Sequence, residues 1–277
     1  MEDIRKITIN GSEINYIEKG EGNPVVFVHG SLGDYRSWGF QMESFSKFFR
    51  VIAYSRRYHY PNKWTGTGSD YSIALHANDL SEFIRTLGIA PAHLVGSSYG
   101  AYVSLYLTSK EPSIVRSLVL GEPPILPWLN DIEGGQILQK EFLTNSFGPA
   151  REAFQNGRME EGVNHFIDGV LGPGTFTRLS PKAREMMMDN AGEMKAETMA
   201  DDYFSPITGN DVSKIKCPVL FLKGEKSPGL FRLITDELHR FLPEAGIITI
   251  PESSHSMQVA NPEFYNKNVI EFLLKNA

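Results

Sequence analysis

Six short runs of almost wholly apolar residues limit what this chain can fold into more than any other feature of its sequence. They lie at residues 24–30, 49–55, 92–98, 116–122, 217–225 and 246–252. Strands that are apolar on both faces are typical of a parallel sheet covered by helices on either side. Helical patterns at 72–89 and 263–276 alternate with these runs. The alternation predicts an α/β fold with a doubly wound, mostly parallel sheet.

The N-terminal residues depart from this parallel pattern. Asn10-Gly11 separates two runs, RKITI and SEINYIEK, in which apolar and polar residues alternate. Asn-Gly between such runs favours a two-residue turn with positive φ at both positions. We therefore expect a β-hairpin before the first apolar strand.

Residues 123–206 carry no comparable strand signal. Aromatic and methionine side chains are plentiful in this interval, at Trp128, Phe142, Phe147, Phe166, Phe176, Met186, Met187 and Met188. We interpret residues 123–206 as a helical insertion that forms a lid, so that residues 1–122 and 207–277 make up the core domain. The alternative is that these side chains form only the small core that such an insertion needs.

Composition and charge exclude several classes of function. The formal net charge of −6 argues against nucleic acid as a partner, because phosphate binding requires a basic surface. No apolar run reaches the roughly 18 residues that a membrane span requires. The N-terminus has neither the basic nor the apolar region of a signal peptide. We expect a cytoplasmic protein, monomeric or homodimeric.

Cys217 is the single cysteine, which excludes an intrachain disulfide and a CxxC site. It precedes an apolar run and is expected to be a small buried hydrophobic residue. The sequence shows no cluster of metal ligands, and we expect neither a metal nor another cofactor.

Ser98 is the candidate nucleophile. It occupies the centre of Gly96-Ser97-Ser98-Tyr99-Gly100, between an apolar run and a helical pattern. A G-x-S-x-G sequence in this context indicates a serine on a sharp, strained strand-to-helix turn, where glycines on either side let the neighbouring backbone approach. The N-terminus of the helix also favours developing negative charge. An ordinary serine-rich turn is the alternative, and Ser97 is interpreted as a flanking residue.

A serine hydroxyl needs a base to take its proton. Among the seven histidines, His255 is the candidate, because it lies in the loop between the last strand and the last helix. There it can reach a serine at the end of a strand. The other histidines are interpreted as packing, surface, substrate-contacting or structural residues: His29, His59, His76, His93, His165 and His239. Of these, His59 in the arginine-rich loop stays open as an alternative base.

Three segments carry a resemblance to a known family: PVVFVHGSLGDYRSW, LVGSSYGAY and SSHSMQVANPEFYN. In combination they resemble the α/β-hydrolase fold family over nearly the whole chain outside the interval 123–206. The resemblance implies an oxyanion hole formed by the backbone N–H of Ser31 or Leu32 together with that of Tyr99. Each such donor is worth roughly a hundred- to a thousandfold in rate. It also implies that His29 orients this loop and does not act as a base.

The family pattern usually has an aspartate where this chain has Ser227. A serine cannot carry the negative charge that steadies a protonated histidine. We predict that Glu122, at the end of the run 116–122, supplies the acid instead. Glu225 is the alternative, and the absence of a functional acid is the third possibility.

The loop 55–64 contains Arg56 and Arg57, which either attract an anionic substrate group or hold the loop as a solvated or salt-bridged pair. We favour the second interpretation, because surface charges usually contribute little.

A nucleophilic serine excludes the dehalogenase and epoxide-hydrolase branches of the family, which need a carboxylate to form an alkyl ester. The expected activity is that of a serine hydrolase acting on a small to medium hydrophobic ester, lactone or thioester. The alternatives are a C–C bond hydrolase, perhydrolase or lyase chemistry, and a non-catalytic member that binds a small ligand. The fold does not identify the substrate.

Overall fold

The computed structural model describes residues 3–201 and 204–277. Within these residues one eight-stranded sheet has the order β1-β2-β4-β3-β5-β6-β7-β8. The strands are β1 (Arg5–Ile9), β2 (Ser12–Lys19), β3 (Pro24–Val28), β4 (Arg50–Tyr54), β5 (Ala92–Ser97), β6 (Val115–Gly121), β7 (Val219–Gly224) and β8 (Gly246–Ile250). β1 and β2 form the expected hairpin, β2 pairs antiparallel with β4, and the pairs from β4 to β8 are parallel. The predicted α/β architecture is confirmed.

Most of the predicted apolar runs extend one or two residues beyond the carboxyl end of the observed strand. Gly, His, Ser and Glu at these ends leave the sheet as loops. His29 thus follows β3, Ser98 follows β5 and Glu122 follows β6. Because parallel strands end at one edge of the sheet, these polar side chains are brought to the same edge.

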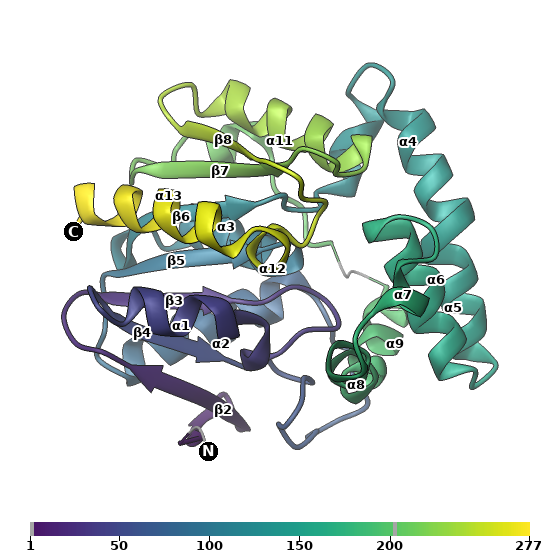
Figure 1. The fold of residues 1–277 in the computed structure, drawn as a ribbon, viewed down its shortest axis with the longest axis horizontal. Coiled ribbons are helices and arrows are strands. Elements are labelled where there is room, and N and C mark those ends of the chain that lie inside the picture. Colours follow the sequence, from purple (N-terminus) through teal and green to yellow (C-terminus); the bar gives the residue numbers. More distant parts are fainter. Residues whose placement is uncertain (1–2, 202–203) are drawn as a thin grey trace.

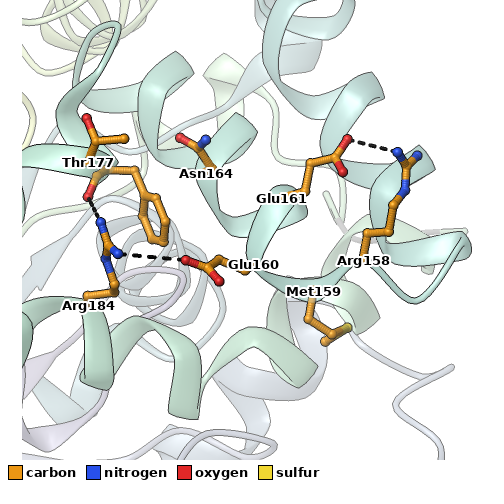
Figure 2. A pocket seen from close by; sticks show the side chains of 8 residues that line it. Arg158, Met159, Glu160, Glu161, Asn164, Thr177 and Arg184 are labelled. Atoms are coloured by element: carbon orange, nitrogen blue, oxygen red, sulfur yellow. Dashed lines mark hydrogen bonds and ion pairs between the residues drawn. The ribbon is translucent and has the colours of Figure 1, made fainter.

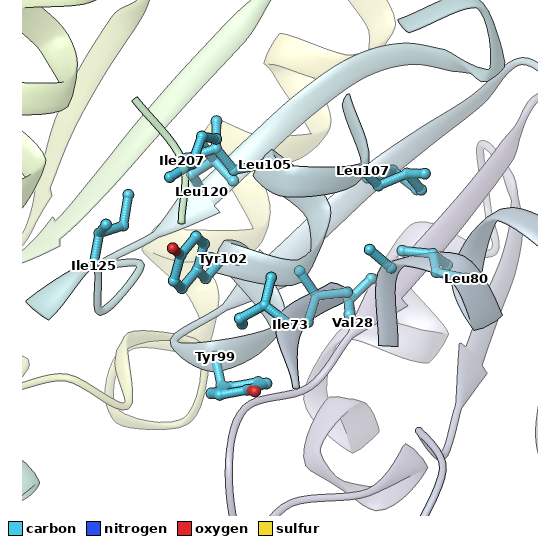
Figure 3. Packing of buried hydrophobic residues seen from close by; sticks show 14 of the residues in the cluster. Val28, Ile73, Leu80, Tyr99, Tyr102, Leu105, Leu107, Leu120, Ile125 and Ile207 are labelled. Carbon is cyan, nitrogen blue, oxygen red and sulfur yellow. The ribbon is translucent and has the colours of Figure 1, made fainter. Parts of the chain in front are cut away.

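Helices cover both faces of the sheet, in two separate apolar clusters. On one face Phe27 and Val95 pack with α1 (Gly39–Phe45) and α13 (Pro262–Lys275). On the other face Val28 and Leu120 pack with α2 (Ile73–Thr86), α3 (Tyr99–Lys110) and α11 (Gly229–Phe241). Figure 3 shows side chains of α2 and α3 against the second face. Burial on both faces is the reason that these strands read as continuous apolar runs.

The interval between β6 and β7 is helical in its described residues, with no strand. Its main helices are η3 (Leu126–Asn130), α4 (Gly135–Phe142), η4 (Leu143–Phe147), α5 (Gly148–Gln155), α6 (Met159–Leu171), α7 (Thr175–Arg178), α8 (Pro181–Asp189) and α9 (Ala191–Met199). These helices lie beyond the carboxyl ends of the parallel strands (Figure 1). They therefore cover the edge of the sheet at which Ser98 and Glu122 lie.

The remaining short elements are η1 (Tyr35–Trp38), η2 (Pro112–Ile114), α10 (Gly209–Val212) and α12 (Met257–Ala260). Among the described helices none is both long and apolar enough to cross a membrane.

Candidate active site

Ser98 lies on the turn between β5 and α3, with φ 53° and ψ −125°. This region of backbone conformation is rare for any residue except glycine, and it persists only where the surroundings enforce it. The Ser98 N–H donates to Gly121 O at 2.7 Å, which ties the turn to the end of β6. The turn presents Ser98, half-buried, beyond the sheet edge.

The two glycines of the motif have the predicted steric role. A Cβ on Gly100 would lie 2.1 Å from Val28 O, and one on Gly96 would lie 2.6 Å from Ala101 Cα. Real Cβ atoms do not approach so closely, so neither position admits a side chain without displacing backbone. The tight turn at Ser98 therefore depends on both glycines.

Glu122 is completely buried immediately after β6, also with a positive φ of 49°. Its Oε2 accepts a hydrogen bond from His255 Nδ1 at 2.6 Å. It also accepts from Ser227 Oγ at 2.9 Å, and its Oε1 accepts from Gly224 N–H at 2.9 Å. The carboxylate is thus fully occupied by three donors. Ser227, at the position where the family pattern usually has an aspartate, is one of these donors, a contact that the sequence did not reveal.

Glu225, the alternative acid, lies elsewhere. Its side chain is exposed, and its Oε2 accepts from the Glu252 N–H at 2.8 Å. The structure thus brings Glu122, and not Glu225, to His255.

His255 lies in the loop between β8 and α12, as expected, with its ring stacked on Phe231 at a centroid distance of 3.8 Å. Because Nδ1 donates to Glu122, Nε2 is the nitrogen that carries the lone pair. Nε2 is buried and has no hydrogen-bond partner within the described part of the chain. The imidazole is therefore oriented to accept a proton at Nε2.

Ser98 opens onto a small cavity of about 20 Å³, roughly the space of one water molecule. Most of its lining is apolar and comes from residues beyond β6. The lining residues are Ser31, Ser98, Pro124, Leu126, Phe142, Phe147, Phe166, Val170, Glu197, Phe204 and Phe231. Phe231 thus lines the cavity and also stacks on the His255 ring.

The loop that follows β3 runs beside Ser98. A Cβ on Gly30 would lie 3.7 Å from Ser98 Oγ. The Leu32 N–H donates to Glu193 Oε2 at 3.0 Å, so this amide is already engaged and the Leu32 alternative for the oxyanion hole is not supported. Ser31 lines the cavity, and Tyr99 begins α3 with Ser98 as its N-cap. Ser31 and Tyr99 remain the candidate amides.

His29 and Arg56 hold this loop in place through hydrogen bonds. His29 Nε2 accepts from the Arg56 N–H at 2.9 Å, while Nδ1 donates to Gly30 O at 2.9 Å. Arg56 Nε donates in return to His29 O at 3.1 Å. Burial and the Arg56 charge hold the pKa of His29 well below its ordinary value. The ring is thus neutral and structural, as the resemblance implied.

Arg57 forms an ion pair with Asp79 of α2, with Nε and Oδ2 at 2.6 Å. Both guanidinium groups of the loop are buried and engaged within the fold. The two arginines do hold the loop, Arg57 through its ion pair and Arg56 through backbone carbonyls, but they are buried and do not form the surface pair that was expected.

Two further acidic residues, Glu193 and Glu197 of α9, are buried beside the same loop. Glu193 Oε1 accepts from Tyr71 Oη at 2.6 Å, and Glu197 Oε2 accepts from Ser31 Oγ at 2.6 Å. Burial raises the pKa of both carboxyls, that of Glu197 to about 8 with a further contribution from the Glu193 charge. Sequence analysis missed this pair, because Glu residues four apart on a helix ordinarily mark a solvated face.

The other histidines take no part in the cavity. His59, the alternative base, donates from Nδ1 to Gly33 O at 2.7 Å, and burial with the Arg56 charge keeps its pKa well below normal. His93 contacts Ser117 at the opposite end of β5. His165 faces Glu161 on α6 and is partly exposed. Across the residues that the structure describes, no group of three or more His, Cys, Asp or Glu side chains is placed to hold a metal.

A larger, open pocket of about 520 Å³ lies among α6, α7 and α8 (Figure 2). Its charged side chains pair with one another: Arg158 with Glu161 at 3.0 Å and Arg184 with Glu160 at 3.8 Å. Because these charges neutralise each other and Ser98 is not among its lining residues, this pocket is not the candidate site.

Comparisons with known proteins agree with this arrangement. A model of the alpha/beta hydrolase family matches residues 25–267. The chain is 23% identical over 261 residues to (E)-2-((N-methylformamido)methylene)succinate hydrolase of Acinetobacter baylyi, covering 93% of both chains. It is 24% identical over 289 residues to epoxide hydrolase 3 of Mus musculus, covering 98% of this chain and 76% of the mouse protein.

Among solved structures, the enol-lactonase from Burkholderia xenovorans LB400 superposes with a TM-score of 0.78 at 19% identity. The match covers 98% of this chain and 100% of the enol-lactonase. At this level of identity the likeness supports the fold.

Proposed function

This chain belongs to the alpha/beta hydrolase family, and on that premise we propose that it is a serine hydrolase. It cleaves a small to medium hydrophobic ester, lactone or thioester through an acyl-enzyme on Ser98. The observation that supports this most strongly is the hydrogen bond of 2.6 Å between His255 Nδ1 and Glu122 Oε2. This bond leaves the other ring nitrogen, Nε2, directed away from the carboxylate, and Glu122 lies at the same edge of the sheet as Ser98.

In the proposed mechanism His255 Nε2 takes the proton of Ser98 Oγ as the oxygen attacks the substrate carbonyl. Glu122 steadies the imidazolium that forms. The N–H groups of Ser31 and Tyr99 receive the negative charge of the tetrahedral intermediate. The imidazolium then protonates the leaving group. In the second half of the reaction His255 takes a proton from water, which attacks the acyl-enzyme, releases the carboxylic acid product and restores Ser98.

The helices of residues 123–206 act as the lid in this proposal, and residues 1–122 with 207–277 act as the catalytic core. Phe142, Phe147 and Phe166 supply much of the apolar lining of the cavity. An apolar cavity closed to about 20 Å³ favours an uncharged acyl chain, and it requires side-chain movement for the substrate to enter.

The nature of the nucleophile distinguishes this activity from that of the mouse relative. Opening an epoxide with Ser98 would leave an ether on the enzyme, and water does not readily cleave an ether. An acyl-serine, by contrast, is an ester that an activated water hydrolyses. Ser98 therefore favours a carbonyl substrate.

A second candidate is cleavage of a bond other than an ester, including a C–C bond, by the same three residues. The relative from Acinetobacter baylyi, a hydrolase of a substituted methylenesuccinate by its name, favours this candidate. The two reactions share Ser98, His255 and Glu122 and differ in the leaving group.

A fluorophosphonate probe tests the proposal, because it labels only an activated serine. The wild-type protein and Ser97→Ala should be labelled, whereas Ser98→Ala should not. A series of p-nitrophenyl esters of increasing chain length should then show turnover by the labelled proteins. Failure of the wild-type protein to be labelled would rule out a serine hydrolase, and labelling without turnover of any ester would favour the second candidate.

A further inference from the structure

Among the described residues that line the Ser98 cavity, Glu197 is the one ionisable side chain. Resting on the proposed function, we propose that Glu197, supported by Glu193, is a specificity-determining residue: it restricts the site to acyl groups without negative charge and rejects substrates that bear a carboxylate. Nothing in the motif or in the family assignment requires an acid at this position.

Hydrogen bonds fix the Glu197 carboxyl at the wall of the cavity. Its Oε2 accepts from Ser31 Oγ at 2.6 Å and lies 3.3 Å from Tyr71 Oη. Ser31 is also a candidate oxyanion amide, so Glu197 stands beside the position of the reacting carbonyl. Glu193, four residues earlier on α9, is held by Leu32 N–H and Tyr71 Oη. Neither carboxyl can turn away to solvent without breaking these bonds.

No cation in the described lining balances an incoming anion. The nearest guanidinium, that of Arg56, donates to His29 O and Gly30 O and lies 4.8 Å over the Tyr99 ring. The Arg57 guanidinium is paired with Asp79. The Arg56 charge interacts electrostatically with Glu193 and Glu197 and is thereby partly neutralised by the carboxyl pair.

The electrostatics of the pair point in the same direction. Burial raises the pKa of Glu193 and of Glu197, so this region resists even a second negative charge on its own side chains. With a pKa of about 8, Glu197 holds its proton at pH 7, and the negative charge of the pair resides on Glu193. A substrate carboxylate would lose its hydration and meet that remaining charge. Like charges brought together in an interface cost several kcal/mol, which corresponds to about a hundredfold or more in selectivity.

The inference separates this chain from its relative in Acinetobacter baylyi, whose name specifies a succinate derivative. A succinate carries two carboxylates, and the cavity beside Glu197 offers them no partner. The acyl group that fits is therefore an uncharged alkyl or aryl chain.

A matched pair of substrates isolates the effect of charge. The p-nitrophenyl ester of monomethyl succinate and p-nitrophenyl hydrogen succinate have nearly the same size and differ by one carboxylate. We expect kcat/KM to be about a hundredfold higher for the neutral diester at pH 7. A matched pair of fluorophosphonates, ending in a methyl ester or a carboxylate, should show the same preference in the rate of labelling of Ser98.

Variants then assign the preference to the pair. In Glu193→Gln/Glu197→Gln the ratio of the two kcat/KM values should fall at least about tenfold, whereas Glu185→Gln, on the exposed face of α8, should leave the ratio unchanged. The ratio is independent of general losses of activity, which affect both substrates alike. Equal rates for the two substrates in the wild-type protein, or an unchanged ratio in the double variant, would refute the inference while leaving the serine hydrolase intact. Absence of labelling by both probes would refute both proposals.

Discussion

Two regions of this molecule bury carboxyl groups beside the same cavity, and they do so in opposite ways. At the carboxyl edge of the sheet, Glu122 is surrounded by three hydrogen-bond donors, from His255, Ser227 and Gly224. On α9, Glu193 and Glu197 lie side by side and share their donors with each other. The first arrangement suits an acid that must carry charge during a reaction, and the second suits acids that resist charge.

The difference also follows the architecture. The position of Glu122 is fixed by strand pairing, since β6 lies between β5 and β7. The positions of Glu193 and Glu197 depend on how the insertion packs onto the loop after β3. In our proposals, the catalytic role falls on a residue fixed by the sheet, and selection of the substrate falls on residues of the helical insertion.

The largest predicted effect concerns the residue that both regions serve. Ser98→Ala should lower kcat for a p-nitrophenyl ester by about a millionfold, because the alanine side chain has no hydroxyl to attack the carbonyl. Steady-state kinetics measures the loss, and Ser97→Ala, with its side chain one residue back in β5, serves as the control. Substantial turnover by Ser98→Ala would show that Ser98 is not the nucleophile, and the roles proposed for the two carboxyl regions would then have no basis.

The next effect tests the sheet-edge carboxylate. Glu122→Gln should keep the fold but lower kcat roughly ten-thousandfold, because an amide cannot stabilise the imidazolium or fix its tautomer. Glu225→Gln should retain wild-type activity. Circular dichroism confirms folding, and the reverse pattern of activities would transfer the acid to Glu225.

A smaller effect is expected at Ser227, which donates to Glu122 at 2.9 Å. Ser227→Ala removes a hydrogen bond to a charged group, so kcat should fall about tenfold. The double variant Glu122→Gln/Ser227→Asp sharpens the test by placing a carboxylate at the position that the family pattern favours. It should recover part of the activity that Glu122→Gln loses, and no recovery would mean that residue 227 cannot serve the imidazole.

The smallest effect concerns stability and the acids of α9. A carboxyl whose pKa rises from 4.5 to about 8 on folding keeps its proton in the native state while the unfolded chain has lost it. The unfolded state then binds fewer protons, so the free energy of unfolding falls as pH rises through this window and levels off above it. The slope from one such group is at most about 1.4 kcal/mol per pH unit.

Urea denaturation at several pH values between 5 and 8 measures this slope. Wild-type protein should lose more stability across the window than Glu197→Gln, and the difference between the two removes the contribution of other groups. Parallel curves for the two proteins would show that Glu197 ionises normally, and the contrast between the two carboxyl regions would then disappear.

Much of the fold was predictable because the buried strands are recognisable in the sequence as apolar runs. Their alternation with helical patterns indicates a parallel sheet. The places of Ser98, Glu122 and His255 were predictable because Ser98 and Glu122 directly follow β5 and β6, and His255 lies in the loop after β8. Their hydrogen-bonded geometry, with Ser227 as a donor, was not predictable, because loop conformations after strands depend on contacts more than 100 residues apart, such as Ser227 with Glu122.

Glu193 and Glu197 were missed for a related reason. Their partners Leu32 and Ser31 are 161 and 166 residues away, and nothing in the helical pattern of α9 specifies which loop it meets. The contact of Glu193 with the Leu32 amide also favours Ser31 over Leu32 as an amide of the proposed oxyanion hole. Sequence patterns describe which face of an element is apolar, but the pairing of polar groups across distant elements emerges only in three dimensions.

The hydrogen bond between Glu193 and the Leu32 amide has one more consequence. It joins α9 of the helical insertion to the loop that carries Ser31. A substrate that displaces α9 on entry is therefore expected to displace that loop as well. Substrate entry and alignment of the candidate amides beside Ser98 would then be coupled. We expect those amides to be correctly placed only after α9 has returned to the position described here.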